Sequence, residues 1–386
     1  MPLCALALSA LGGAAACLVL GGAAARLWER VRRRAFAKVE DRATGVARRA
    51  GAPPSVNIVE EAWKSKEPKA PDGCIDYELA TSRELENERG FLTLCGGTNI
   101  FYQVWAPKDA QVQAVVVFIH GFGDHSDFLM GVKAQAVCNL GPFAAFGFDL
   151  PGHGRSDGLS VHIPDWHAFV GEAHEVVKGH LLPMARRRWG KVKIFGLGES
   201  MGGGVLYSML VKEKDLFDGA VLVCPMLYVS RDLFPPWVVL QIFKHILVRL
   251  LPLWPIAPNK DISEFIFEDP EMHKFVDNAP YHKNLLSNAP PRLATAFTLA
   301  FAAGDWMRER LGEFDVPALI IHGGGDAVTD HRVSKELFAK MKHPDKTFMY
   351  PDGVWHVDLF HGGPTKREGC RERFEAVAAW LKERSS

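Results

Sequence analysis

Hydrophobic residues along this chain alternate between short unbroken runs and longer stretches with helical spacing. The short runs are typical of strands buried on both faces of a parallel sheet. They occupy residues 114–119, 144–148, 192–195, 220–223, 318–321 and 347–350, and the segments 91–94 and 99–105 predict a hairpin before them. Helical spacing marks residues 166–180, 203–212 and 371–382. This alternation predicts a doubly wound α/β fold, in which ligands bind beyond the carboxyl ends of the strands.

The chain before residue 91 has a different character. Residues 3–25 carry no charge and are followed by Arg26, Arg30 and three arginines at 32–34. We expect residues 1–37 to form a hydrophobic membrane anchor with a basic flank. We expect the catalytic domain that follows to lie in the cytosol. A cleaved or organelle-targeting segment and a buried apolar helix are the alternatives. Residues 38–90 are polar and rich in proline, which predicts a linker and a folded domain over 91–386.

Charge and cysteine content narrow the function. Lys+Arg and Asp+Glu both number 45, so no basic field favours a nucleic acid as partner. The seven cysteines are scattered without a C-x-x-C pair, and His167 and His174 match no zinc spacing. No phosphate-binding G-x-x-x-x-G-K occurs. We therefore expect no metal and no organic cofactor.

The turn after residues 192–195 carries the strongest chemical signal. It reads Gly198-Glu199-Ser200-Met201-Gly202, a G-x-S-x-G motif between a predicted strand and a predicted helix. Small residues on both sides allow the strained backbone that exposes a nucleophile, and the helix N-terminus behind it favours negative charge. Ser200 is therefore the predicted nucleophile.

A serine hydroxyl needs a base and a carboxylate that orients the base. On a scaffold of this kind these partners follow the serine in chain order, in turns after later strands. Residues 318–321 lead to Asp326, with Asp330 as the alternative, and residues 347–350 lead to His356, with His361 as the alternative.

The oxyanion of the tetrahedral intermediate needs backbone N–H donors. Met201 follows the nucleophile and supplies one. The other is predicted at Phe122, because Gly121 and Gly123 allow the loop after residues 114–119 to turn inward.

The stretch at about 226–312 is much longer than one crossover helix requires, and it predicts a helical cap. Its first half has a helical apolar stripe with Trp237 and Trp254 near the ends. The stripe comprises Val239, Ile242, Phe243, Ile246, Leu247 and Leu250. The stripe is interpreted as a core face packed on the main domain, or as an acyl-chain tunnel or a lid that touches membrane. Both interpretations can hold at once, since a lid helix can line a pocket from one side.

Together these segments resemble the monoacylglycerol lipase group of α/β-hydrolases, including its plant and algal lysophospholipase-like and caffeoylshikimate esterase-like members. The resemblance extends from residue 91 to the C-terminus and rests on the motifs at 120–126, 149–157, 198–203, 291–296 and 322–330. It implies an α/β-hydrolase fold, a triad of Ser200, Asp326 and His356, and a mobile cap that faces lipid. Animal members bind the glycerol headgroup through an acid, an arginine and a second histidine. Asp124 matches the acid, but Phe128 and Leu359 stand at the other two positions.

The expected function is that of a carboxylic ester hydrolase acting on single-chain lipids, foremost monoacylglycerol. Lysophospholipids and hydroxycinnamoyl esters of the caffeoylshikimate type are the neighbouring alternatives. An acyltransferase, an aminopeptidase and a non-catalytic membrane-tethered binding protein complete the set. The expected partners are a small lipid ester and a membrane surface.

Overall fold

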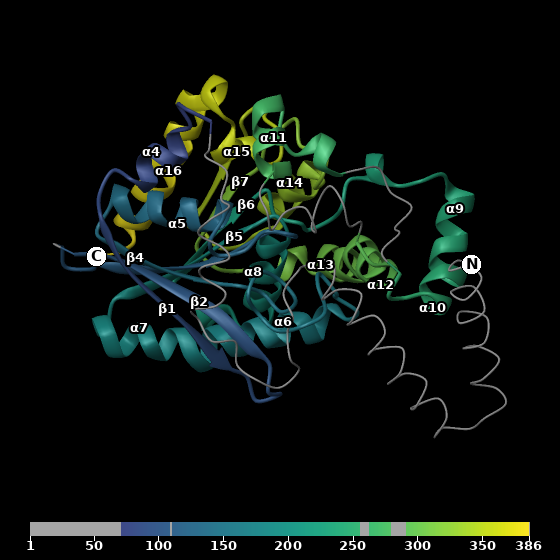
Figure 1. Cartoon of the computed structure of the whole chain (residues 1–386), viewed down its shortest axis with the longest axis horizontal. Coiled ribbons are helices and arrows are strands. Elements are labelled where there is room, and N and C mark those ends of the chain that lie inside the picture. Colours follow the sequence, from purple (N-terminus) through teal and green to yellow (C-terminus); the bar gives the residue numbers. More distant parts are fainter. Residues whose placement is uncertain (1–70, 109, 255–261, 279–290, 386) are drawn as a thin grey trace.

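The computed structural model describes residues 71–108, 110–254, 262–278 and 291–385, and these residues are built around one eight-stranded sheet (Figure 1). The strand order is β1-β2-β4-β3-β5-β6-β7-β8. β3 to β8 run parallel to one another, whereas β2 is antiparallel to both β1 and β4. The strands are β1 (Leu85–Thr93), β2 (Asn99–Pro107), β3 (Ala114–Ile119), β4 (Phe143–Phe148), β5 (Lys193–Glu199), β6 (Gly219–Val223), β7 (Ala318–Ile321) and β8 (Lys346–Met349). The predicted doubly wound α/β-hydrolase fold is confirmed.

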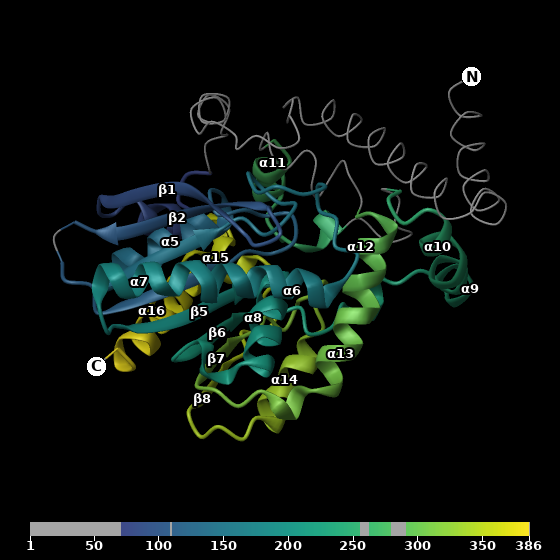
Figure 2. The same cartoon turned by 90° about the horizontal axis from the view of Figure 1, so that it is seen from below.

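Helices cover both faces of the sheet, which explains the unbroken apolar runs of its strands (Figures 1 and 2). Val116 and Phe118 of β3 pack on one face, against α4 (Ile75–Ala80), α5 (Leu129–Leu140), α15 (Asp358–His361) and α16 (Arg367–Glu383). Val117 and Ile119 pack on the other. The helices of that second face are α6 (Trp166–His174), α7 (Leu182–Trp189), α8 (Met201–Lys212), α13 (Gly304–Glu309) and α14 (His331–Lys340).

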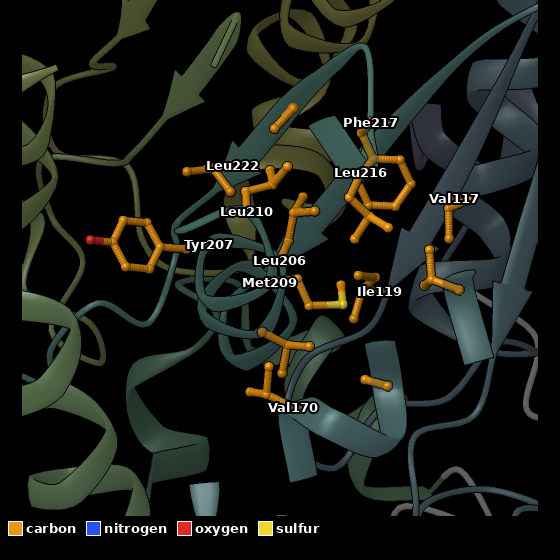
Figure 3. Packing of buried hydrophobic residues seen from close by; sticks show 14 of the residues in the cluster. Val117, Ile119, Val170, Leu206, Tyr207, Met209, Leu210, Leu216, Phe217 and Leu222 are labelled. Atoms are coloured by element: carbon orange, nitrogen blue, oxygen red, sulfur yellow. The ribbon is translucent and has the colours of Figure 1, made fainter. Parts of the chain in front are cut away.

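Helix α8 is fixed by its apolar side. Figure 3 shows Leu206 and Met209 of α8 among Ile119 of β3 and Val170 of α6, and these side chains are buried in one cluster. Fully burying one such side chain stabilises the fold by about 1.5–3 kcal/mol. The N-terminus of α8, directly after Ser200, is thereby held at the carboxyl end of β5.

The folded domain begins earlier than predicted, and the linker expected over residues 38–90 is wrong in its last part. α4 starts at Ile75 and β1 at Leu85. β1 is an edge strand whose residues Glu86 to Glu88 are exposed, so it lacks the apolar alternation of a half-buried strand. α4 spans six residues, too few to show a helical period.

The cap lies between β6 and β7, over the carboxyl ends of the strands. Its first part, α9 (Trp237–Ile242) to α10 (Val248–Leu250), projects away from the sheet (Figures 1 and 2). The cap also contains η3 (Arg231–Leu233), η4 (Phe243–Leu247), η5 (Ile262–Phe265), α11 (Pro270–Asn278), α12 (Leu293–Phe297), η6 (Thr298–Ala303) and η7 (Leu311–Glu313). Short helical segments outside the cap are η1 (Glu175–Leu181), η2 (Lys214–Leu216) and η8 (Pro364–Lys366).

The helical stretch from α9 to α10 has two apolar faces, where one was expected. Leu240, Phe243 and Leu247 pack onto a cluster with Leu293 and Phe301. The second face, which we call the exposed stripe, points to solvent. It comprises Val239, Ile242, Ile246 and Leu250, each 39 to 49% exposed, and is flanked by Trp237 and Trp254 at 72% and 44%. A single core face therefore does not account for the whole pattern.

Within the described residues, no helix has the length and apolar content needed to cross a bilayer. The predicted anchor at 1–37 lies outside these residues.

Candidate active site

Ser200 sits on the sharp turn that joins β5 to α8. Its backbone has φ 54° and ψ −121°, in the left-handed region that a residue with a side chain rarely adopts. Such a conformation costs on the order of 1–3 kcal/mol and persists only where its surroundings enforce it. Here the Ser200 N–H donates to the Val223 carbonyl at 2.9 Å, and the Ser200 carbonyl accepts from the N–H groups of Gly204 and Met226.

The two glycines of the motif make the turn sterically possible. A Cβ on Gly198 would lie 2.5 Å from the Gly202 carbonyl oxygen. A Cβ on Gly202 would lie 2.0 Å from the Ile119 carbonyl oxygen. Both contacts are with backbone, which cannot move aside, so the G-x-S-x-G spacing is a packing requirement at this position.

The structure brings Ser200, His356 and Asp326 together in one hydrogen-bonded chain. The Ser200 Oγ lies 2.9 Å from His356 Nε2. On the other side of the ring, His356 Nδ1 lies 2.6 Å from Asp326 Oδ2. Because the carboxylate only accepts, Nδ1 carries the proton and Nε2 is free to accept the serine proton.

Asp326 is held by more donors than His356 alone. Its carboxylate accepts the backbone N–H groups of Val328 and Thr329 at 2.8 and 2.9 Å, the Thr329 hydroxyl at 2.9 Å and His322 Nε2 at 3.1 Å. Sequence reasoning assigned no role to His322 or Thr329. Position in the chain could have pointed to His322, since it directly follows β7, where site residues of this fold are expected.

The electrostatics of this chain favour the charged pair that exists once His356 Nε2 has taken the serine proton. Burial raises the pKa of Asp326, but His356 and His322 outweigh burial and hold the pKa well below its usual range. Burial likewise disfavours a charged His356, but the Asp326 carboxylate outweighs it, and the His356 pKa lies well above 6.5. An imidazolium formed at His356 is therefore stabilised where it forms.

The alternative residues lie elsewhere. Asp330 caps α14, accepting the Arg332 N–H at 3.0 Å and pairing with the Arg332 guanidinium at 2.8 Å. His361 is fully buried, with Nδ1 2.5 Å from Asp76 Oδ2 of α4. Neither side chain hydrogen-bonds to Ser200 or His356.

The predicted oxyanion donors flank the nucleophile. A Cβ on Gly121 would lie 3.3 Å from the Ser200 Cβ, so the backbone before Phe122 passes directly against Ser200. Met201 begins α8 on the other side. Among the described residues, no group accepts a hydrogen bond from the N–H of Phe122 or Met201.

Ser200 and His356 open into a large apolar pocket beneath the cap. The space beneath the cap, counted together with its open mouth, is about 1330 Å³. Its lining comes from the loop around Phe122, the Ser200 turn, the cap and the His356 loop. The apolar lining includes Phe122, Leu129, Met226, Val229, Leu233, Phe234, Leu240, Phe243, Ile266, Val276, Leu299, Phe301, Val328 and Val357.

Asp124 is an acid at the wall of this pocket. Its Oδ2 accepts the Met130 N–H at 3.0 Å, whereas Oδ1 is buried with no hydrogen-bond partner in the described part of the chain. Burial raises the pKa of Asp124 to about 7. Phe128 stacks on Phe275 with ring centroids 5.5 Å apart, and Leu359 is fully buried, so both occupy packing positions.

One group of donor atoms in the described chain has metal-like proximity, and it overlaps the hydrogen-bonded chain. Cys224, Asp326 and His356 each offer an atom within 4.8 Å of the others. Both His356 nitrogens are already engaged with Ser200 and Asp326, and burial raises the pKa of the Cys224 thiol. The geometry therefore suits proton transfer and gives no positive sign of a metal.

Comparison with known proteins agrees with this geometry. The family model described as serine aminopeptidase, S33, matches residues 110–361. A caffeoylshikimate esterase from Arabidopsis thaliana is 26% identical over 80% of this chain and 89% of its own, and a monoacylglycerol lipase from Mycolicibacterium smegmatis is 28% identical over 68% and 87%. The crystal structure of a Paleococcus ferrophilus monoacylglycerol lipase superposes with a TM-score of 0.57 at 24% identity, covering 78% of this chain and 99% of that one.

These relatives are esterases and lipases, which confirms the expectation of a carboxylic ester hydrolase at the level of enzyme class. The matched family segment spans most of the chain and contains Ser200, Asp326 and His356. The chain belongs to the serine aminopeptidase S33 family and is an α/β-hydrolase of the monoacylglycerol lipase group.

Proposed function

We propose that this protein is a serine hydrolase that cleaves the carboxylic ester of single-chain lipids, foremost monoacylglycerol, to free fatty acid and glycerol. The observation that carries the proposal is the chain from Ser200 through His356 to Asp326, which opens into an apolar pocket. A soluble, polar substrate would not need such a pocket, whereas an acyl chain gains stability from every methylene buried there.

The reaction follows from the geometry. The Ser200 Oγ attacks the ester carbonyl carbon while its proton moves to His356 Nε2, 2.9 Å away. The tetrahedral intermediate collapses, the glycerol oxygen leaves with the proton from Nε2, and the acyl group stays on Ser200. Water then attacks the acyl-enzyme while its proton moves to Nε2, and Nε2 passes that proton to the Ser200 Oγ as the fatty acid leaves. Asp326 keeps the ring in the required tautomer and stabilises its charged form.

The N–H groups of Phe122 and Met201 would bind the oxyanion. Both are adjacent to Ser200, and neither is used by another group of the described chain. Donors that are fixed before the reaction stabilise the developing charge without reorganising, and one of them is typically worth ~10²–10³ in kcat.

The polar groups of the pocket fit an uncharged headgroup. Asp124 offers a free oxygen that can hydrogen-bond a glycerol hydroxyl, and its pKa near 7 leaves it partly neutral. No lysine or arginine belongs to the described lining, so a phosphate or a shikimate carboxylate would lack a cation. This favours monoacylglycerol over a lysophospholipid.

A hydroxycinnamoyl ester is the second candidate. The lining includes four phenylalanines (Phe122, Phe234, Phe243 and Phe301), which can pack against an aromatic acyl group, and the Arabidopsis relative is a caffeoylshikimate esterase. An aminopeptidase is less favoured, because a substrate ammonium needs an unpaired negative charge. Glu199 is paired with Lys133, and burial keeps Asp124 partly neutral.

We also propose that the exposed stripe meets a lipid surface. Its four aliphatic side chains are flanked by Trp237 and Trp254, a residue type that favours the membrane interface. Phe243, on the inner face of the same helical stretch, lines the pocket. A lipid could therefore pass from the surface to Ser200 beneath these helices. An anchor at residues 1–37 would hold the domain at the same membrane.

A panel of substrates tests the proposal. Monooleoylglycerol, lysophosphatidylcholine and a caffeoyl ester are each incubated with the full chain and with Ser200→Ala, and the released acid is measured. We expect release from monooleoylglycerol at least ten times faster than from the other two, and none with Ser200→Ala. Faster release of caffeic acid would move the assignment to the second candidate, and release that survives in Ser200→Ala would contradict the mechanism.

A further inference from the structure

A buried ion pair and a buried hydrogen bond between a histidine and a carboxylate lie behind the Ser200 turn, and the proposed reaction uses neither. The Lys133 Nζ of α5 lies 2.5 Å from Glu199 Oε2, and their side chains are 0% and 6% exposed. His361 Nδ1 of α15 lies 2.5 Å from Asp76 Oδ2 of α4, and these side chains are 0% and 1% exposed. All four groups are therefore shielded from solvent.

The two pairs are neighbours around Lys133. Burial alone would raise the pKa of Glu199, but Lys133, followed by His361 and His356, outweighs burial and lowers it. Lys133 also lies 5.0 Å from the ring centroid of Phe360, the neighbour of His361.

A contribution to the stability of the fold does not by itself explain why these polar pairs are buried. Desolvating two charges can cost as much as their attraction returns, and replacing a buried pair with apolar residues is often neutral or stabilising. Leaving one partner unpaired is different, because the remaining charge is then buried without compensation. A buried pair therefore fixes the relative position of the elements that carry its members more strongly than it stabilises the fold.

The elements fixed here are those that carry the reacting side chains. Glu199 is the residue before Ser200, and His361 ends the short helix that follows His356. Nothing covalent holds the two loops near each other, yet Ser200 Oγ and His356 Nε2 must stay at 2.9 Å. A misplacement of about 1 Å between reacting groups can cost ~10² in rate.

We propose that Lys133 and His361 are positioning residues for the Ser200 turn. Lys133 holds Glu199, and through it the nucleophile. His361, anchored by Asp76, ties the His356 loop to α4. The proposal rests on the proposed function, since it assigns these residues to the alignment of Ser200 with His356.

The test compares charge variants in the full chain. Lys133→Met leaves Glu199 buried and unpaired, whereas Lys133→Met with Glu199→Gln removes the unpaired charge. We measure the rate at which a fluorophosphonate labels Ser200, together with kcat and KM on a soluble ester. Lys193→Met is the matched control, because Lys193 pairs with Asp218 at 2.9 Å at the opposite end of the same strand.

We expect Lys133→Met to slow labelling and to lower kcat by about 10- to 100-fold, with KM within about twofold. The double variant should recover to within about fivefold of the wild-type rate, and Lys193→Met should match the wild type. A lysine that serves only as packing would not be rescued by neutralising Glu199. Labelling of Lys133→Met at the wild-type rate, or no recovery in the double variant, overturns the role of Lys133.

Variants of His361 provide an independent test of the proposal. This test remains available if Lys133→Met fails to fold. His361→Asn retains a donor for Asp76 and should label within about threefold of the wild type, whereas His361→Leu should label at least ten times more slowly. Equal rates for the wild type and His361→Leu overturn the proposal. If the wild type itself is not labelled, the proposed function fails and the positioning role fails with it.

Discussion

Ser200 and His356 are 156 residues apart in the chain, yet Ser200 Oγ lies 2.9 Å from His356 Nε2. Ser200 follows β5 and His356 lies in the loop after β8, and all parallel strands of the sheet end at the same edge. Asp326, in the loop after β7, completes the contact at that edge. The fold thus gathers the three groups because their strands share a direction.

Asp326→Asn should lower kcat by about 10⁴, because an amide cannot hold His356 in the tautomer that accepts the serine proton. Asp330→Asn is the control within the same loop. Asp330 caps α14, and asparagine is also a good cap, so activity and stability should stay near wild-type values. Steady-state hydrolysis of a soluble ester distinguishes the two. Comparable losses in both variants would contradict the assignment of Asp326.

Gly202→Ala should abolish hydrolysis and destabilise the domain, because its Cβ would lie 2.0 Å from the Ile119 carbonyl oxygen. Gly171→Ala is the matched change. Gly171 lies in α6 with nothing within 4 Å of an added Cβ, so alanine should stabilise the helix by about 0.5–1 kcal/mol. Thermal unfolding measures the stability of each variant, and ester hydrolysis measures its activity. Normal activity in Gly202→Ala would show that the turn is not tight.

The pH dependence of stability should carry a contribution from Asp124. Its pKa is about 7 in the folded chain and near 3.8 when unfolded, so the native state binds more protons over that range. Stability then falls as the pH rises from about 4 to 7, by at most about 4 kcal/mol. Asp124→Asn removes this loss. Urea unfolding of both forms should give a difference that grows up to about pH 7 and then levels off. A constant difference would contradict the shifted pKa.

Ile242→Ser with Ile246→Ser should weaken binding to phosphatidylcholine vesicles by at least about tenfold, since each buried isoleucine is worth about 1.5–3 kcal/mol. Both residues belong to the exposed stripe, and neither lines the pocket. Hydrolysis of a soluble ester should therefore be unchanged, while hydrolysis of vesicle-borne monooleoylglycerol falls. Unchanged cosedimentation with vesicles would rule out the stripe as a lipid-binding surface.

The sheet was predictable because its central strands are buried on both faces. Such strands leave unbroken apolar runs, and the turn residues after β5, β7 and β8 stand out against them. The predicted runs at 114–119 and 318–321 coincide with β3 and β7. β1 was placed only in part, since an edge strand with Glu86 and Glu88 in solvent has no such pattern.

The sequence was less informative where distant residues meet. Periodicity marked one apolar face on the cap, but it could not show that Phe243 turns inward while Ile246 stays in solvent. The contact of His322 with Asp326 and the pairing of Lys133 with Glu199 depend on how loops and helices are placed in space. A lysine inside an amphipathic helix is ordinarily taken as exposed, and Lys133 is fully buried.

Covalent labelling of Ser200 tests the central claim most directly. The full chain is treated with a fluorophosphonate, digested, and the modified peptide is identified by mass spectrometry, with Ser200→Ala treated in parallel. The account predicts stoichiometric modification of Ser200, loss of ester hydrolysis in proportion to labelling, and no modification of the variant. An intact enzyme that hydrolyses monooleoylglycerol while Ser200 stays unmodified, or a Ser200→Ala variant that retains activity, would contradict it.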